Sequence, residues 1–281
     1  MDTPQLELDV SSTLESGQTF SWQRGRSGCY WSVIEGQTVA ACPGKVPDWD
    51  SAYDYFRLGD DLPTIYGEIG RDEFMRKAIS SLEGMRIVKA DPWETSLSFM
   101  ASAHNSVREI RASLLRMRQA LGSRAAGKST QEELGYELRA FPTPSQVTMM
   151  SVEQMIDFGF GFRSKNMLEF AASVERGDFD PYSLAGLGYD RAREALMDVK
   201  GIGPKIADCI LLFSLGYLQA FPVDVWIRKV VSRVYLGKDD ENEERVRRFG
   251  TSYFGRYAGY AQEYIYAYSR GVRGQGPGPS P

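Results

Sequence analysis

The chain has few of the residues on which metal and nucleophile chemistry usually depend: one histidine and three cysteines among 281 residues. The single histidine, His104, argues against a histidine-ligated zinc site and against a Ser-His-Asp triad. Cys29, Cys42 and Cys209 cannot all pair and show no CxxC spacing, so we expect neither a disulfide framework nor a cysteine-ligated cluster. Acid and base chemistry therefore falls to carboxylates, lysines or tyrosines, and we expect no metal and no other cofactor.

The chain also lacks an excess of positive charge and any apolar run of the ~18 residues that a membrane span needs. Its net charge of −4 argues against a protein that coats nucleic acid indiscriminately, although a local basic face is compatible with it. The N-terminus has neither the basic start nor the apolar core of a signal peptide. We expect an intracellular, monomeric protein without membrane contact, cytoplasmic in a prokaryote and nuclear in a eukaryote.

Strand patterns occupy the first 60 or so residues. Leu6, Leu8 and Val10 alternate with polar residues, and aromatic or β-branched stretches at 20–22 and 30–34 are separated by glycines. From about residue 72 the apolar residues recur with helical spacing, and no convincing strand follows. The predicted fold class is α+β, with a small antiparallel sheet followed by roughly ten short helices.

This change of pattern sets the predicted domains. An N-terminal α+β domain should span residues 1–85 and a helical domain residues 86–270. The remaining residues, 271–281, are rich in glycine and proline and should be disordered.

Start and stop signals bound the predicted helices. Asp91 offers an N-cap, with a proline at the first helical position and a glutamate at the third, and Ser151 with Gln154 has capping-box spacing. Thr143-Pro144, Pro204 and Pro222 mark further entries. Glycines stand where helices should end, at Gly122, Gly177, Gly216 and Gly237.

Residues 190–231 carry the most information about function. The spacing of their apolar residues predicts one helix, a tight turn through Gly201 and Gly203, and a second helix that opens at Pro204 and stops at Gly216. Glycines leave no Cβ to block a phosphate, and the free N–H groups of the second helix would point at it. The turn is therefore suited to gripping a DNA backbone without reading sequence, although a plain interhelical turn is the alternative for this pattern alone.

Lys205 and Asp224 stand at consecutive helix entries in apolar surroundings. The helix dipole and burial both disfavour a charged lysine, which would make Lys205 a nucleophile near neutral pH; a surface phosphate contact is the alternative. Asp224 can be a simple N-cap, or a desolvated carboxylate that stabilises a cationic sugar. Together, the amine and the carboxylate could break a glycosidic bond and trap C1′.

The run GIGPKIADCILL…PVDVW resembles the hairpin and Gly/Pro-Asp signature of the DNA glycosylase superfamily, and its KIADC continuation is similar to 8-oxoguanine DNA glycosylases. Three more segments resemble that subfamily: SGQTFSW at 16–22, the segment 91–105, and AGYAQ at 258–262. The matches extend over nearly the whole chain in the same order.

The resemblance implies a bifunctional enzyme that excises 8-oxoguanine from duplex DNA and then cleaves the strand by β-elimination. It implies that Lys205 attacks C1′ to form a Schiff base while Asp224 stabilises the developing cation. The resemblance assigns base binding to five residues: Gly17, Cys209, Pro222, Gln262 and Tyr266. The Gly17 carbonyl would accept from the N7–H that guanine lacks, Gln262 would bind the Watson–Crick edge of the base, and Tyr266 would stack on it. Cys209 and Tyr266 could instead be packing residues.

DNA contacts are implied for Asn105, Arg163, Gly201 and Gly203, with Arg163 reaching the opposite cytosine. Two departures from the family pattern stand out. The family's asparagine-rich run appears here as Ala103-His104-Asn105, and Trp226 replaces a histidine that binds phosphate in animal members. We therefore expect the chemistry to be retained and the preference for cytosine to be looser.

Three alternatives fit the sequence less well. A thymine-glycol type endonuclease needs four C-terminal cysteines for an iron–sulfur cluster, and none lies beyond Cys209. A methylated-base glycosylase usually lacks a lysine at the position of Lys205. A DNA-binding module without enzymatic activity would have no need of Asp224.

Overall fold

The computed structural model describes residues 7–103 and 105–271, and these residues divide into two compact units. Unit 1 gathers three segments of the chain, up to Gln18, Asp50–Ala90 and from Pro204 onward; unit 2 comprises Thr19–Trp49 and Asp91–Gly203. The predicted division at residue 85 remains a prediction, and all but the first residue of the predicted tail lies outside the described residues.

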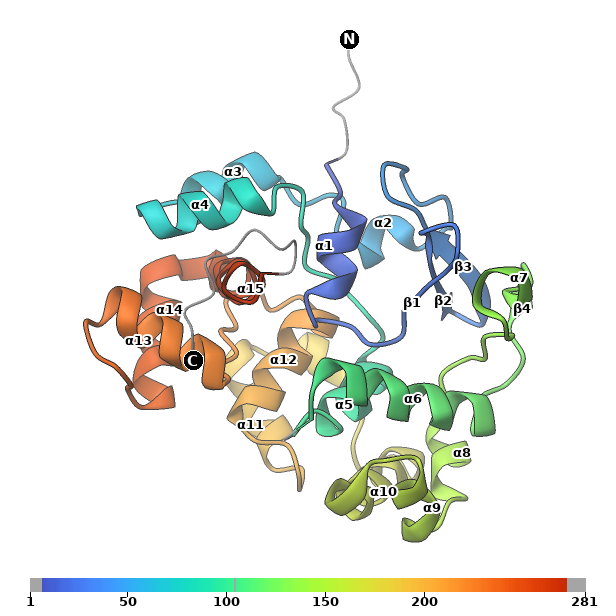
Figure 1. Cartoon of the computed structure of the whole chain (residues 1–281). Coiled ribbons are helices and arrows are strands. Elements are labelled where there is room, and N and C mark those ends of the chain that lie inside the picture. Colours follow the sequence, from blue (N-terminus) through green and yellow to red (C-terminus); the bar gives the residue numbers. More distant parts are fainter. Residues whose placement is uncertain (1–6, 104, 272–281) are drawn as a thin grey trace. The chain divides into compact units, whose positions relative to one another are not determined.

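Unit 2 holds the sheet, in the order β1-β2-β3-β4 (Figure 1). The antiparallel strands β1 (Gln23–Arg24), β2 (Tyr30–Ile34) and β3 (Gln37–Ala41) confirm the predicted N-terminal sheet. The two-residue strand β4 (Ala126–Gly127) adds to β3 in parallel, which the sequence does not predict.

One predicted strand is wrong. Val10 begins the helix α1 (Val10–Glu15), because Asp9 caps it by accepting from the Ser12 N–H at 2.9 Å. Val10 and Leu14 both lie in the core, so the apolar residues follow a helical period rather than an alternating one. The predicted strand residue Leu6 lies outside the described residues.

The helices of unit 2 start and stop largely where the sequence signals predict. The capping boxes at Ser106, Thr143 and Ser151 are all formed. These helices are α5 (Pro92–Met100), α6 (Val107–Leu121), α7 (Gln131–Leu134), α8 (Pro144–Thr148), α9 (Val152–Asp157), η1 (Gly161–Arg163), α10 (Ser164–Glu175), η2 (Ser183–Gly186) and α11 (Tyr189–Met197).

Unit 1 is built around α15 (Ala258–Ser269), a helix buried on nearly every side. It packs against α3, α4, α13 and α14 (Figure 1). The other elements of this unit are α2 (Ala52–Tyr55), α3 (Leu62–Ile69), α4 (Glu73–Ser81), α12 (Pro204–Leu215), α13 (Val225–Tyr235), α14 (Glu243–Phe254) and η3 (Gly255–Tyr257). No helix of the described residues has both the length and the apolar character needed to cross a bilayer.

Buried tyrosine hydroxyls fix α15 in position. Tyr264 donates to the Met85 carbonyl at 2.8 Å and lies 2.9 Å from the hydroxyl of Tyr66, and Tyr260 donates to Asp60 at 2.7 Å. Because a buried hydroxyl without a partner is costly, these bonds select one rotation of the helix about its axis. The rotation decides which side chains of α15 face the functional site.

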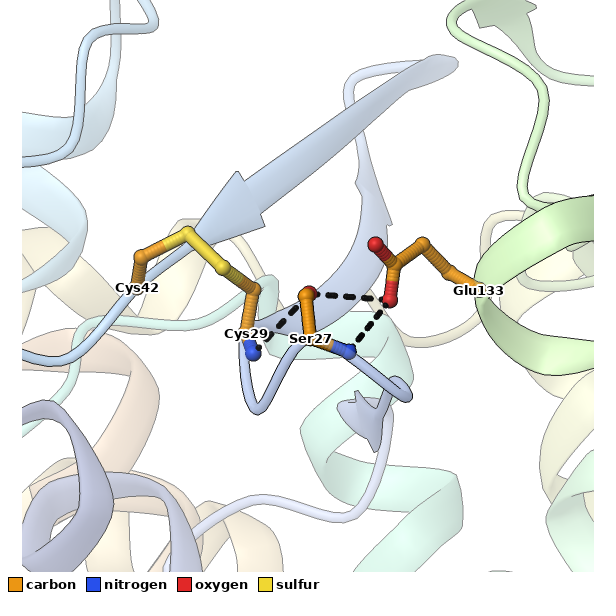
Figure 2. The surroundings of a disulfide bond; sticks show 4 residues. All are labelled: Ser27, Cys29, Cys42 and Glu133. Carbon is orange, nitrogen blue, oxygen red and sulfur yellow. Dashed lines mark hydrogen bonds between the residues drawn. A yellow bond between two sulfur atoms is a disulfide. The ribbon is translucent and has the colours of Figure 1, made fainter.

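A disulfide joins Cys29 and Cys42, which corrects the expectation drawn from the cysteine count. The hairpin explains it: Tyr30 pairs with Ala41, so Cys29 lies opposite Cys42, with a Cα–Cα distance of 4.2 Å. Figure 2 shows the turn that precedes Cys29. Glu133 of the helix at 131–134 accepts from the N–H and the hydroxyl of Ser27 in this turn, at 3.0 and 2.9 Å. Cys209 is the remaining cysteine, and it is buried.

Reducing this disulfide should destabilise the protein. A bridge that closes a loop over a sequence separation of 13 should contribute about 3 kcal/mol, because it restricts the unfolded chain. Thermal unfolding with and without a thiol reductant measures the effect. The Cys29→Ser/Cys42→Ser variant should unfold at the temperature of the reduced wild type and should not respond to reductant. Equal midpoints for oxidised and reduced wild type would contradict this.

Candidate functional site

The predicted helix-turn-helix that carries Lys205 is present. Helix α11 ends at Met197, the turn passes through Gly201 with φ of +93°, and α12 begins at Pro204. A Cβ at Gly201 would meet the Nδ2 of Asn166 at 2.9 Å, so both the conformation and the space require glycine. The second residue of α12 is Lys205, which is half-buried. One turn later on α12 lies Cys209, only 3% exposed.

Asp224 is the N-cap of α13. Its Oδ1 accepts the Ile227 N–H at 2.7 Å, which confirms the predicted cap. The carboxylate is half-buried and follows the buried residues Phe221, Pro222 and Val223. A negative charge suits this place, because the N–H groups of the first helical turn carry partial positive charge.

Helix α15 brings three polar side chains to the same unit. Gln262 and Glu263 are 4% and 3% exposed, and Tyr266 is half-buried. Helix α15 also lies close to α12: a Cβ at Gly259 would lie 2.3 Å from the Cδ1 of Leu212 and 3.0 Å from the Leu218 carbonyl oxygen, so a side chain there would force its neighbours to move. Leu212 of α12, the helix that carries Lys205, therefore contacts α15, the helix that carries Gln262, at Gly259.

Mutual electrostatic effects show that five of these groups form one cluster, which we call the lysine cluster: Lys205, Cys209, Asp224, Glu263 and Tyr266. Burial raises the pKa of the Cys209 thiol to about 12, with a smaller opposing effect from Lys205. Burial also raises the pKa of Tyr266 to about 12, and Asp224 and Glu263 add to it. The structure thus brings together both predicted catalytic residues and two predicted base-binding residues.

Glu263 is the unexpected member of the lysine cluster. Burial raises the pKa of its carboxyl to about 8, the charge of Asp224 raises it further, and Ser16 and Lys205 act in the opposite direction. Its Oε1 is buried without a hydrogen-bond partner among the described residues, as is the Oε1 of Gln262. Two neighbouring side chains of α15 therefore each keep a buried acceptor free.

Gly17 is held by its neighbour Gln18. The side-chain amide of Gln18 donates to the Thr13 and Arg86 carbonyls at 2.9 and 2.8 Å and accepts from the Val88 N–H at 2.8 Å. Gly17 itself has φ of +98°. Because Gln18 is 1% exposed, breaking these bonds would leave buried polar groups unpaired, so the carbonyl of Gly17 is rigidly placed.

Arg270 fixes the ring of Tyr266. It donates to the Tyr266 hydroxyl at 2.9 Å, and its guanidinium carbon lies 5.4 Å from the centre of that ring and 5.6 Å from the centre of the Trp226 ring. An exposed arginine between two aromatic rings stabilises both of them by cation–π attraction. Trp226 therefore contributes to the placement of Tyr266.

Four predicted DNA-binding residues belong to unit 2. Gly201 and Gly203 lie in the hairpin turn, exposed and half-buried respectively. Asn105 donates to the Ala101 carbonyl at 3.1 Å, and Arg163, 7% exposed, donates to the carbonyls of Phe160 and Ala103. Arg163 and the turn at 101–105 are thus linked in unit 2.

Sequence reasoning missed three residues of this region. Glu263 gave no signal, because a glutamate next to Gln262 is as compatible with a solvated face as with burial. Gln18 stood inside the quoted motif without a role. Phe162 is 72% exposed, with the Arg163 guanidinium carbon 4.4 Å from its ring centre, and a large aromatic next to a predicted DNA-binding arginine could have identified it.

Comparison with known proteins places this site in context. Residues 97–255 match the family model of the HhH-GPD superfamily of base excision DNA repair proteins, and residues 49–95 match that of the 8-oxoguanine DNA glycosylase N-terminal domain. A probable N-glycosylase/DNA lyase of Methanothermobacter thermautotrophicus is 28% identical over 76% of this chain and 72% of its own. An N-glycosylase/DNA lyase of Saccharomyces cerevisiae is 26% identical over 88% and 73%.

A solved structure agrees with these sequence matches. The 8-oxoguanine glycosylase/lyase of Clostridium acetobutylicum, in complex with double-stranded DNA that contains cytosine opposite 8-oxoguanine, is 28% identical. The similarity covers 94% of this chain and 92% of that one, with a TM-score of 0.86.

The buried carboxyl of Glu263 should cost the protein stability as the pH rises. Its pKa is raised to about 8 from 4.5, so between these values the unfolded chain gives up a proton that the folded chain retains. Stability from this group is therefore lost from about pH 4.5 to about pH 8, and Glu263→Gln should be more stable than wild type by about 3 kcal/mol at pH 7. Denaturant unfolding at pH 5, 7 and 8 tests this. The difference should grow with pH, and a constant difference would show that Glu263 is ionised in the folded protein.

Proposed function

The chain belongs to the HhH-GPD superfamily of base excision DNA repair proteins, as an N-glycosylase/DNA lyase of the 8-oxoguanine type, and we propose that Lys205 and Asp224 carry out its chemistry. The observation that carries this assignment is the lysine cluster itself: one half-buried amine shares its surroundings with a capped carboxylate at the next helix entry. Double-stranded DNA containing 8-oxoguanine is the substrate.

In the proposed reaction, the neutral amine of Lys205 attacks C1′ of the damaged nucleotide. The N-glycosidic bond breaks and its electron pair leaves with the base, while Asp224 stabilises the positive charge that develops on the sugar. The nitrogen of the new C–N bond gives up a proton, and its lone pair forms the Schiff base as the ring C1′–O bond opens and the released ring oxygen takes up a proton. Loss of a proton from C2′ then expels the 3′ phosphate, which is the β-elimination that cuts the strand.

Base recognition falls to the groups around the cluster. The carbonyl of Gly17 would accept from the N7–H of 8-oxoguanine, and the rigid bonds of Gln18 support this role because they fix where that carbonyl points. The free Oε1 of Gln262 suits the N–H groups of a purine's Watson–Crick edge. Tyr266 would stack on the base, with Cys209 and Pro222 as apolar walls.

DNA would be held by few contacts. The amides around Gly201 and Gly203 would bind phosphate, and Asn105 and Arg163 would approach the opposite strand. Arg163 would then have to exchange its bonds to the Phe160 and Ala103 carbonyls for DNA, which supports a looser preference for cytosine. Because its substrate is DNA, we assign the enzyme to the interior of the cell.

Replacing Lys205 should remove the chemistry and spare binding. We expect Lys205→Gln to give no covalent product with borohydride on an 8-oxoguanine duplex, because no Schiff base can form, while the hairpin amides still bind the duplex. Gel analysis of borohydride trapping and a binding titration measure the two effects. Lys77→Gln, at an exposed lysine of α4, is the matched control and should trap like wild type. A covalent borohydride product from the Lys205→Gln variant would mean that another amine of the protein forms the Schiff base.

Replacing Gln262 should separate base reading from strand cleavage. Gln262→Ala removes a buried hydrogen-bonding group, so excision of 8-oxoguanine should fall by roughly tenfold or more. Cleavage at a preformed abasic site should remain near the wild-type rate, since that substrate has no base to read. Single-turnover rates on the two duplexes give the comparison. Equal losses on both would assign Gln262 to the architecture of the site rather than to the base.

A further inference from the structure

An exposed arginine borders the proposed base pocket. Arg270 follows the last residue of α15, and its side chain donates to the Tyr266 hydroxyl at 2.9 Å. Its guanidinium carbon lies 5.4 Å from the centre of the Tyr266 ring and 5.6 Å from the centre of the Trp226 ring. The positive charge is therefore held in one place, beside the side chain that is proposed to stack on the damaged base.

The guanidinium of Arg270 still has hydrogen-bond donors to offer. An arginine side chain carries five N–H groups, and the contact with Tyr266 uses one of them. No carboxylate of the described residues forms an ion pair with Arg270. A planar guanidinium that is fixed in place and unpaired suits a ligand with two anionic oxygens, such as a phosphate.

Helix α13 extends the positive charge away from Arg270. Trp226 lies in its first turn, and Lys229 and Arg233 follow at intervals of three and four residues, so the three side chains share one face of the helix. Lys229 is half-buried and Arg233 is exposed, and within the described residues neither has an acidic partner. The sequence of α13 contains no aspartate or glutamate, in a chain whose net charge is −4. Positive charge is thus concentrated here against the balance of the whole chain.

Arginines close by in the chain are neutralised by acids. Arg228, on another face of α13, pairs with Asp240 at 3.2 Å. On α14, Arg247 and Arg248 both pair with Glu244, at 2.8 and 2.9 Å. A paired arginine has less attraction left for a phosphate, because its charge is already balanced. The unpaired cations beside Tyr266 and on α13 are therefore better placed to bind a polyanion.

The length of this basic face fits one strand of DNA. Trp226, against whose ring Arg270 lies, and Arg233 are about two helical turns apart, which is about 10 Å along the helix axis. One strand of a duplex carries one phosphate for about every 3.4 Å of the duplex axis, so about three phosphates fall within that length. Three cations thus face a stretch that holds a similar number of phosphates.

We propose that Arg270, Lys229 and Arg233 form a phosphate track that binds the backbone of the damaged strand, next to the nucleotide that enters the base pocket. Arg270 contacts the phosphate closest to that nucleotide, because it borders Tyr266. The two cations of α13 bind phosphates further along the same strand. The inference rests on the function proposed above, since the place of the damaged base defines which strand the track follows.

The salt dependence of binding tests the phosphate track. The quantity measured is the dissociation constant, over a range of salt concentrations, for a duplex with a tetrahydrofuran abasic site, which offers Tyr266 no base to stack on. Each phosphate contact contributes about 0.9 to the slope of log K against log salt. Arg270→Gln should make the slope shallower by about 0.9, and Lys229→Gln/Arg233→Gln by about 1.8. For Arg270→Gln, the loss of affinity relative to wild type should be about eightfold greater at 0.1 M than at 1 M salt.

Two further variants separate charge from architecture. Arg270→Lys keeps the positive charge and loses the planar fork, so it should retain the wild-type slope even where its affinity falls. Arg248→Gln, at an exposed arginine of α14 whose charge Glu244 balances, is the matched control and should leave the slope unchanged. A role of Arg270 in placing Tyr266 alone would not alter the slope on this duplex.

A methylphosphonate, which removes the charge of a single phosphate, identifies the strand. At one of the two phosphates that flank the abasic site on the damaged strand, this replacement should weaken binding by wild type about eightfold at 0.1 M salt. The same replacement should weaken binding by Arg270→Gln less than about twofold, because the partner of that phosphate is already gone. On the opposite strand, the two proteins should respond alike.

Two results would overturn the phosphate track. One is a wild-type slope for Arg270→Gln or for Lys229→Gln/Arg233→Gln. The other is a difference between wild type and Arg270→Gln that appears only with a methylphosphonate on the opposite strand. Failure of the proposed function looks different: the wild type would form no Schiff base with an 8-oxoguanine duplex, while the slopes on the abasic duplex would still shift as expected.

Discussion

Burial limits how much charge the site can hold, and the arrangement of its side chains follows from that limit. One half-buried amine, Lys205, can be matched by one carboxylate, and the N–H of Ile227 at the start of α13 makes Asp224 the carboxylate that is best placed to be charged. Burial and the neighbouring Asp224 raise the pKa of Glu263 to about 8, although the hydrogen bond with Ser16 and the charge of Lys205 act in the opposite direction. Two carboxyl groups of one cluster thus have different surroundings: Asp224 accepts a helix N–H, whereas Glu263 is more deeply buried and its pKa is raised.

The site is assembled from parts of the chain that are far apart in the sequence. The Gly17 segment comes from the start of the chain, Lys205 and Asp224 from its last third, and Gln262 and Glu263 from its last helix, all within unit 1. Gly259 lets α15 approach α12, and the hydroxyls of Tyr260 and Tyr264 set the rotation of α15. The precision of the site therefore comes from the core of unit 1, which fixes side chains that no local sequence could place.

The features that the sequence predicted are those decided within a few residues. The caps at Asp91, Ser151 and Asp224, the stop at Gly216 and the hairpin at Gly201 depend on local backbone geometry, and all are present. Features decided by tertiary burial escaped prediction. Val10 begins a helix because that places it in the core, and Cys29 meets Cys42 because the hairpin register aligns them. The raised pKa of Glu263 has the same origin, since only the folded surroundings determine how much water reaches its carboxyl.

Because the chain has a net negative charge, the buried hydrogen bonds around the site matter more for binding DNA than they would in a basic protein. A protein with a net charge of −4 has little long-range attraction for DNA, so phosphate contacts alone hold a duplex weakly. Extruding a base costs a few kcal/mol of lost stacking, which a few well-placed contacts must offset. A contact returns its full value only when the protein group is already in position, because ordering it during binding would consume part of the gain. The bonds of Gln18 and the anchoring of Tyr266 by Arg270 each provide such preparation. If these residues read the base as proposed, its discrimination depends on rigidity more than on charge.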